Sequence, residues 1–306
     1  MPLTLTLTPR THQERPDARQ PVWRRLRRHA LALVAPLTLL WRTLFADVRQ
    51  ALRASDLEEA LDSPHQLDAE QVVTGLWQRW GEEEARRTLP VLIGQTWTDL
   101  GATLAPEMAM LAGQPLPFLG SDPAVQQASD AYVGEEVQDL WQTSLTTTRQ
   151  LLRDGTRSGL ATGLLAALLA QTFGLTPRQL RRLRQGQQQM LEAGASPAQV
   201  QQAVTQAVAT GVQHRVRTIA ETEAFSIVNL GQRLAMEQAA QQGGVVRLVR
   251  RTWIITDDER LCIWCEQIPA MNPDGVGLDE PFRTPYGNVL DPPVHPLCRC
   301  SVEYSL

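Results

Sequence analysis

The chain has 306 residues, 43% of them hydrophobic, and a net charge of −4, which excludes an intrinsically disordered protein and leaves room for one large core or two domains. Its 29 basic residues are all arginine. Its four cysteines all lie in the last fifty residues, which excludes the disulfide framework of a small secreted domain and favours a reduced compartment.

We predict a basic N-terminal arm and helix over residues 1–53, a segment with ten arginines against three acidic residues. Residues 3–8 alternate Leu and Thr, a pattern that fits either a strand pairing with a neighbouring subunit or a frayed tail. Residues 22–53 predict a helix with a kink near Pro36. The arginines and aromatic residues make this segment the candidate for contact with packaged DNA, a portal surface or a membrane face. An ordinary helix packed on its own domain is the alternative.

The apolar run from Leu31 to Leu40 follows a cluster of arginines, as the core of a signal peptide would. No cleavage site with small residues follows it, and the run begins late in the chain, so we expect no signal peptide. We also expect it to be too short to span a bilayer, which needs about 20 apolar residues, and to be interrupted by Pro36.

Residues 54–113 predict an N-terminal helical region with long helices and a break at Pro90. Trp77, Trp80 and Trp97 fall on apolar helical faces and are expected to be core anchors rather than ligand stackers. The Gly- and Pro-rich stretch at residues 111–120 is the clearest candidate boundary.

Residues 121–242 predict a helical bundle that begins at Asp122-Pro123. Residues 160–169 are apolar all round and are expected to be buried against several neighbours. Thr176-Pro177 and Ser196-Pro197 each combine a hydroxyl cap with proline and begin two further helices. The arginines of the first of these fit either phosphate binding or a solvated helix face: Arg178, Arg181, Arg182 and Arg184.

A helix over residues 212–241 carries the acidic pair Glu221 and Glu223 in a mostly apolar stretch. Paired carboxylates can perform acid/base catalysis. No histidine or glycine-rich loop stands beside them, so we interpret them as salt-bridge or capping partners, with Arg217 and Glu221 as an i,i+4 pair.

Residues 243–306 predict a small C-terminal module with both α and β structure. A strand over residues 245–255 leads to Cys262 and Cys265, and His295, Cys298 and Cys300 follow after a long turn-rich loop. Cysteines two residues apart can bind one tetrahedral ion, and a later His/Cys pair can complete its coordination, so the spacing predicts a structural zinc knuckle. The loop has almost no apolar content, and we expect its order to depend on the metal.

The sequence does not determine which residue is the fourth ligand of this site. Cys262, Cys265 and Cys298 are the safest ligands, and His295 and Cys300 compete for the last place, since Cys298 and Cys300 are one residue apart and would strain to share an ion. Disulfide pairing is the alternative. A catalytic zinc site would keep an open position near a general base, and the sequence contains no H-E-x-x-H pattern.

The cysteine segment resembles a known family. The resemblance rests on three stretches: Trp253-Ile-Ile-Thr-Asp257-Asp258, Arg260-Leu-Cys262-Ile-Trp-Cys265 and His295-Pro-Leu-Cys298-Arg-Cys300. These resemble the C-terminal signature of phage head morphogenesis proteins, the Mu F-like minor head proteins. Residues 217–231 resemble the helix that precedes that signature, although the family usually has a basic residue where Glu221 stands. The resemblance covers roughly residues 130–304.

The resemblance implies a structural minor head protein of a tailed bacteriophage or a prophage-derived particle. Such a protein lies in the head interior or at the portal vertex of the virion, after assembly in the host cytoplasm. The implied partners are the portal protein, the major capsid protein, or both, with a homo-oligomer also open. We expect it to act in head assembly and in DNA packaging or delivery, and not as an enzyme.

Two other functions remain open. The first is a zinc-containing nuclease or toxin enzyme on a helical carrier. The sequence lacks the grouping of His, Asp and Lys residues that such an enzyme would use, which argues against this function. The second is a membrane-active internal virion protein used during DNA entry. The fold class expected in every case is mainly α: a helical bundle body with a small C-terminal zinc-knuckle-like module.

Overall fold

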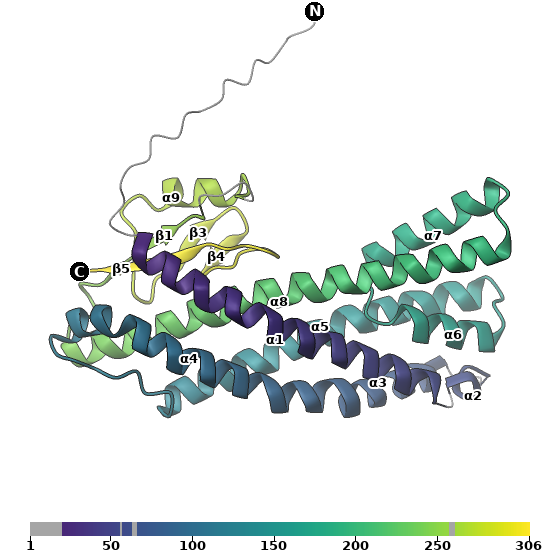
Figure 1. The fold of residues 1–306 in the computed structure, drawn as a ribbon, viewed down its shortest axis with the longest axis horizontal. Helices are drawn as coiled ribbons and strands as arrows, with labels where there is room; N and C mark the ends of the chain where they lie inside the picture. Colours follow the sequence, from purple (N-terminus) through teal and green to yellow (C-terminus); the bar gives the residue numbers. More distant parts are fainter. Residues whose placement is uncertain (1–19, 56, 63–65, 257–260) are drawn as a thin grey trace, which may run out of the picture.

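The structure, a computed structural model, describes residues 20–55, 57–62, 66–256 and 261–306. Long helices form an elongated body, and a small module of short strands and turns lies against one end of it (Figure 1). This arrangement confirms the mainly-α prediction with a C-terminal α+β module. The Leu/Thr alternation at residues 3–8 and the Asp257-Asp258 part of the family signature lie outside the described residues.

The body contains eight helices among the residues described, and the last of them leads into the module. The body helices are α1 (Gln20–Arg53), α2 (Leu57–Asp62), α3 (Gln66–Trp77), α4 (Glu83–Ala112), α5 (Pro123–Arg157), α6 (Thr162–Thr172), α7 (Pro177–Glu192) and α8 (Pro197–Gly243). A π-helical segment, Gln78–Glu82, joins α3 to α4. The module contains β1 (Arg250–Ile254), a 3-10 turn (Cys265–Gln267), α9 (Ile268–Met271), β2 (Val276–Gly277), β3 (Phe282–Thr284), β4 (Gly287–Val289) and β5 (Ser301–Ser305).

The core of the body lies where α1, α4 and α8 pack against one another. Helix α1 turns one face inward, because its apolar residues recur every three or four positions. Its residues Leu37, Trp41 and Leu44 are fully buried. Buried apolar residues from α1 through β5 form one continuous cluster, so the module shares its core with the helical body.

Helices α4 and α8 approach closely at Gly231. A Cβ atom built there would lie 2.4 Å from Cδ1 of Trp97, whose indole donates a hydrogen bond of 2.8 Å to the carbonyl of Ile227. We expect Gly231→Ala to lower the free energy of unfolding by about 1–3 kcal/mol, because the buried ring cannot move aside. Gly186→Ala in α7 is the matched control: nothing lies within 4 Å of its built Cβ. It should instead stabilise by about 0.5–1 kcal/mol. Urea titration of both variants measures the contrast, and equal effects would contradict the packing.

Two predicted helix boundaries are wrong. Helix α4 continues through Pro90, because the residues beside it, Leu89 and Ile93, are fully buried and their packing outweighs the lost backbone hydrogen bond. The helix that begins at Ser196-Pro197 and the one predicted for residues 212–241 are a single helix, α8. The predicted caps at Thr176 and Ser196 are confirmed, each as a full capping box.

Two burial predictions also need correction. Trp77 and Trp97 are core residues, but Trp80 is 47% exposed. The π-helical segment between Trp77 and α4 shifts the helical phase, so residues with apolar helical spacing on either side of it no longer lie on the same face of the helix. In α6, Leu165 and Leu169 are buried but Leu164 is 63% exposed, so this helix has an inner and an outer face after all.

Among the described residues, one helix is long and apolar enough to cross a membrane by length and composition, namely residues Arg24–Arg53 of α1. The expectation that this segment is too short is therefore wrong, because Pro36 lies inside one continuous helix. Since α1 also supplies a full stripe of the core, the same features describe the core helix of a soluble protein.

The module is built on a three-stranded antiparallel sheet with the order β2, β1, β5, and β3 pairs with β4 in a separate hairpin. Trp253 of β1 stands opposite Val302 of β5, and both are buried. The predicted strand began at residue 245, but β1 begins only at Arg250. Gly244 ends α8 in the left-handed conformation, and the backbone N–H of Val245 bonds back to the carbonyl of Ala240, so these residues turn instead of extending.

Candidate metal centre

The five predicted ligands come from two short segments that the sheet brings together. Cys262 and Cys265 lie between β1 and α9, with Cys265 at the first position of the 3-10 turn. His295, Cys298 and Cys300 lie in the segment that leads into β5. Because β1 and β5 are hydrogen-bonded neighbours, the segments at their ends face each other.

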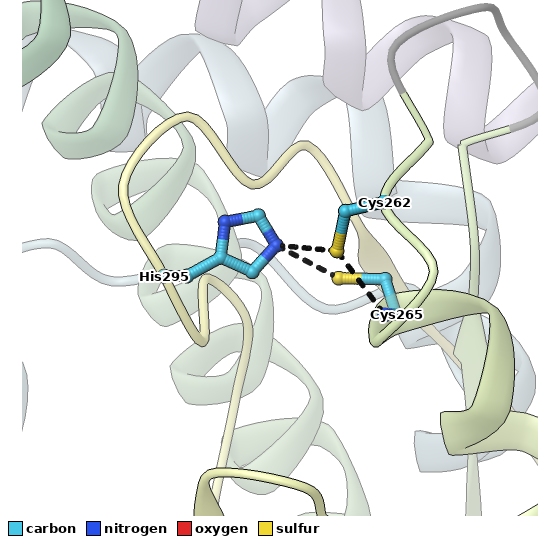
Figure 2. Close-up of side chains that lie close together, drawn as sticks. All are labelled: Cys262, Cys265 and His295. Atoms are coloured by element: carbon cyan, nitrogen blue, oxygen red, sulfur yellow. Dashed lines mark hydrogen bonds between the residues drawn. The ribbon is translucent and has the colours of Figure 1, made fainter.

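The first cluster of ligands joins Cys262, Cys265 and His295. The Nε2 atom of His295 lies 3.0 Å from the Sγ atom of Cys262 and 3.1 Å from the Sγ atom of Cys265. Figure 2 shows the imidazole nitrogen pointing between the two sulfurs. Three donor atoms of the types that zinc prefers therefore converge on one point.

The second cluster joins Cys265, Cys298 and Cys300, so Cys265 belongs to both. The sulfurs of Cys265 and Cys298 are 3.8 Å apart. Two sulfurs bound to one tetrahedral zinc at bonds of about 2.3 Å would lie about 3.8 Å apart, whereas a disulfide brings them to about 2.05 Å. All four cysteines are free thiols in the structure. The separation fits a shared ion.

Cys298 and Cys300 both reach Cys265, although we expected residues so close in sequence to strain against each other. They precede β5, and side chains two residues apart in an extended chain point to the same side. The competition that the sequence predicts between His295 and Cys300 remains open, because each belongs to a group that can hold a metal ion.

The three buried thiols differ in acidity. Hydrogen bonds from Cys265 and Cys300 lower the pKa of Cys298 well below its usual value, and the hydrogen bond with Cys298 raises the pKa of Cys265. Cys298 therefore loses its proton first, and the thiolate is the form that binds metal.

Backbone contacts orient the ligands. The Nδ1 atom of His295 lies 2.9 Å from the carbonyl oxygen of Pro296, which leaves Nε2 free for coordination. The backbone N–H of Cys265 donates to the Sγ atom of Cys262 at 3.2 Å, a contact that stabilises a thiolate. The donor atoms, their separations and their orientation are thus compatible with zinc.

Helix α8 holds the second ligand segment in place. The backbone N–H of Leu297 donates to the hydroxyl of Thr222 at 2.9 Å. Asn229 donates to the carbonyl of Cys300 at 3.1 Å, and Gln232 donates to the carbonyl of Val302 at 2.8 Å. Asn229 and Gln232 are buried and lie on one face of α8. The module is thereby tied to the helix that precedes it, a role that the sequence did not reveal.

The loop between the two ligand segments contributes buried apolar residues to the common core, which its low apolar content did not predict. Ile268, Leu278 and Phe282 are buried, and the ring of Phe282 packs edge-on against Trp253 with centroids 5.1 Å apart. The loop has few apolar residues, but these three point inward.

Arg251 in β1 is the second support of this loop and was missed from the sequence. Its side chain is fully buried and lies over the ring of Phe282. The guanidinium donates to four loop acceptors, namely the carbonyls of Gly277 at 3.1 Å, of Leu290 at 3.0 Å and of Glu280, and the carboxylate of Asp291 at 3.4 Å. Arg233 of α8 also pairs with Asp291, at 2.6 Å. An inward-facing position of β1 is thus occupied by an arginine whose hydrogen-bond partners lie 26 to 40 residues away in the sequence.

Of the two acidic residues singled out in α8, one behaves as predicted. Arg217 and Glu221 form the expected i,i+4 ion pair, with 2.6 Å between Nε and Oε1. Glu223 is not a salt-bridge or capping partner. It is 4% exposed and accepts a hydrogen bond from the hydroxyl of Tyr132 in α5. Burial raises the pKa of Glu223 well above its usual value, and its contact with Glu136 raises it further.

Glu223 gives a pH-dependent prediction. Because its folded-state pKa lies above the unfolded value, the folded protein keeps a proton that the unfolded chain releases, and stability falls as pH rises from about 4.5 toward the folded pKa. We expect Glu223→Gln to raise the Tm at neutral pH by a few degrees, with the gain shrinking toward about pH 4. Thermal unfolding at several pH values measures this. Glu221→Gln is the control without such a gain, and a lowered Tm for Glu223→Gln at neutral pH would contradict a protonated Glu223.

Fold and site together define a mainly helical protein whose small C-terminal module carries a possible Cys/His metal site. No protein-family model, curated protein or solved structure matches this chain. The likeness to phage head morphogenesis proteins therefore rests on the residues quoted above.

Proposed function

We propose that this protein is a structural minor head protein of a tailed bacteriophage or a prophage-derived particle, bound near the portal in the head interior. The observation that carries the proposal is that the quoted signature residues gather around Cys265, which forms one group with Cys262 and His295 and a second group with Cys298 and Cys300. A sequence likeness spread over distant segments gains weight when two of those segments meet in space and the third, in α8, is hydrogen-bonded to one of them.

The metal in this proposal is zinc in a structural role. Sulfur and imidazole donors favour zinc over calcium or magnesium, which take oxygen ligands. When bound, the ion would link the two ligand segments and so brace the module. Five candidate donors lie in the two groups, one more than a tetrahedral ion binds, so the protein's own side chains can fill every coordination position and leave none for a substrate. This supports a non-enzymatic role in assembly and in DNA packaging or delivery.

The partners of the proposal are the portal protein, the major capsid protein, or both. The outer face of α1 offers a second contact, to packaged DNA. Arg24, Arg28, Arg42 and Arg53 are exposed along this helix, and arginine binds phosphate in a bidentate manner.

The test mixes the purified chain with portal oligomers and, separately, with duplex DNA and with liposomes. Stable portal binding without DNA cleavage is the expected result. Metal-dependent nicking that survives repurification would contradict it in favour of a nuclease. Liposome leakage that requires residues 22–53, without portal binding, would contradict it in favour of a membrane-active protein.

A further inference from the structure

A long groove lies between α7 and α8, on the part of the body away from the metal module (Figure 1). Its volume is about 1200 Å³, above the range of roughly 300–1,000 Å³ for small-molecule pockets. Along α8 it extends from Ala203 to Ile219, which corresponds to about 24 Å of helix. A groove of this length matches a helical segment better than a compact ligand.

The walls of the groove are mostly apolar and partly made of small residues. Ala203 and Ala207 lie four residues apart on α8, Gly186 lies on α7, and Ala193 directly follows α7. Small residues on one face allow the backbone of another helix to approach closely. The larger apolar residues of the lining are Leu140, Leu175, Leu183, Met190, Val204 and Ile219.

The charge of the groove has one sign. Its lining includes Arg178, Arg182, His214 and Arg215 and not a single carboxylate. Arg178 and Arg182 are exposed, and within the described part of the chain neither forms an ion pair, whereas Arg184 of the same helix pairs with Asp154. Arg215 is 5% exposed and donates to the carbonyl of Gly174 at 3.0 Å, and it forms no ion pair with any residue that the structure describes. In a chain of net charge −4 this is a local positive patch.

We propose that this groove binds an amphipathic helix of a partner protein, with apolar residues against α7 and α8 and acidic residues facing Arg178 and Arg182. Helix-in-groove binding uses apolar anchors at helical spacing and complementary charges for orientation. Residues 1–19 of this chain are a poor occupant, because they carry three arginines against two acidic residues. The proposal is independent of the metal centre.

Gly186 makes the groove testable without disturbing the fold. It lines the groove, and nothing lies within 4 Å of a Cβ built on it. Gly186→Trp therefore places a large ring in the groove and replaces a poor helix former with a better one. Gln185→Trp is the matched control, since Gln185 is exposed on the same helix and does not line the groove.

The experiment selects binders of the full-length chain from a displayed library of amphipathic helices about 16 residues long, the length of the groove. We expect enriched helices to be rich in Asp and Glu at one end. A synthetic copy should bind with micromolar Kd, and Gly186→Trp should abolish binding. Arg178→Gln and Arg182→Gln should each weaken it about three- to fivefold. Arg181→Gln and Gln185→Trp should leave it unchanged, because neither residue lines the groove.

Three outcomes would overturn the proposal. The first is enrichment no greater on the wild-type chain than on Gly186→Trp. The second is enrichment of neutral or basic helices. The third is binding of a fluorescent long-chain carboxylate that Gly186→Trp blocks while no helix competes, which would assign the groove to a small amphiphile.

Discussion

Replacing Cys265 with serine is expected to release the metal and to open the loop of residues 267–293 to proteolysis while the helical body stays intact. Cys265 is the one cysteine common to both groups of ligands among the described residues, so its loss weakens every possible coordination. Structural zinc contributes on the order of 10–16 kcal/mol to the folding of small zinc domains, far more than one side-chain contact. Metal analysis of the purified variant and limited proteolysis between residues 267 and 293 measure the two effects.

The other ligands give graded versions of this experiment. Cys262→Ser and Cys298→Ser should also release metal and increase cleavage between residues 267 and 293. His295→Ala and Cys300→Ser identify the fourth ligand. The variant that lacks the true fourth ligand should lose metal, and the other variant should keep it. Retention of metal and unchanged digestion in Cys262→Ser, Cys265→Ser and Cys298→Ser together would rule out the knuckle.

Arg251→Met is expected to destabilise the module by about 3–5 kcal/mol even with metal bound. The substitution keeps much of the side-chain volume but removes the donors for the loop carbonyls of Gly277, Leu290 and Glu280. It also leaves the buried carboxylate of Asp291 with Arg233 as its remaining cationic partner among the described residues. Hydrogen exchange of residues 276–291 should rise strongly.

Arg250→Met is the control for this prediction. Arg250 is the neighbouring residue of the same strand, and its side chain is exposed, so its replacement should change stability by less than about 0.5 kcal/mol. Equal effects of the two variants would show that the loop does not depend on the buried guanidinium.

Local chemistry explains which features the sequence predicted. The cysteine spacing pointed to the groups that can hold a metal ion because two thiols two residues apart can share one tetrahedral ion. Thr176-Pro177 and Ser196-Pro197 gave correct helix starts because a cap acts within four residues. The Arg217–Glu221 pair was predictable for the same reason.

The missed features depend on contacts between distant residues. Glu223 was interpreted as a salt-bridge or capping partner because its actual partner, Tyr132, lies 91 residues away in α5. Arg251 looked like one of several strand arginines until the loop that it holds was placed around it. The continuity of α4 through Pro90 could not be inferred either, because it depends on packing that offsets a local penalty.

The central claim is that one zinc ion, bound by the thiolates of Cys265 and its neighbours, stabilises the C-terminal module. X-ray absorption at the zinc edge on the natively purified protein tests it most directly. The account predicts one zinc per chain with three or four sulfur neighbours at about 2.3 Å. A preparation without transition metal, in which residues 267–293 nevertheless resist proteolysis, would contradict it.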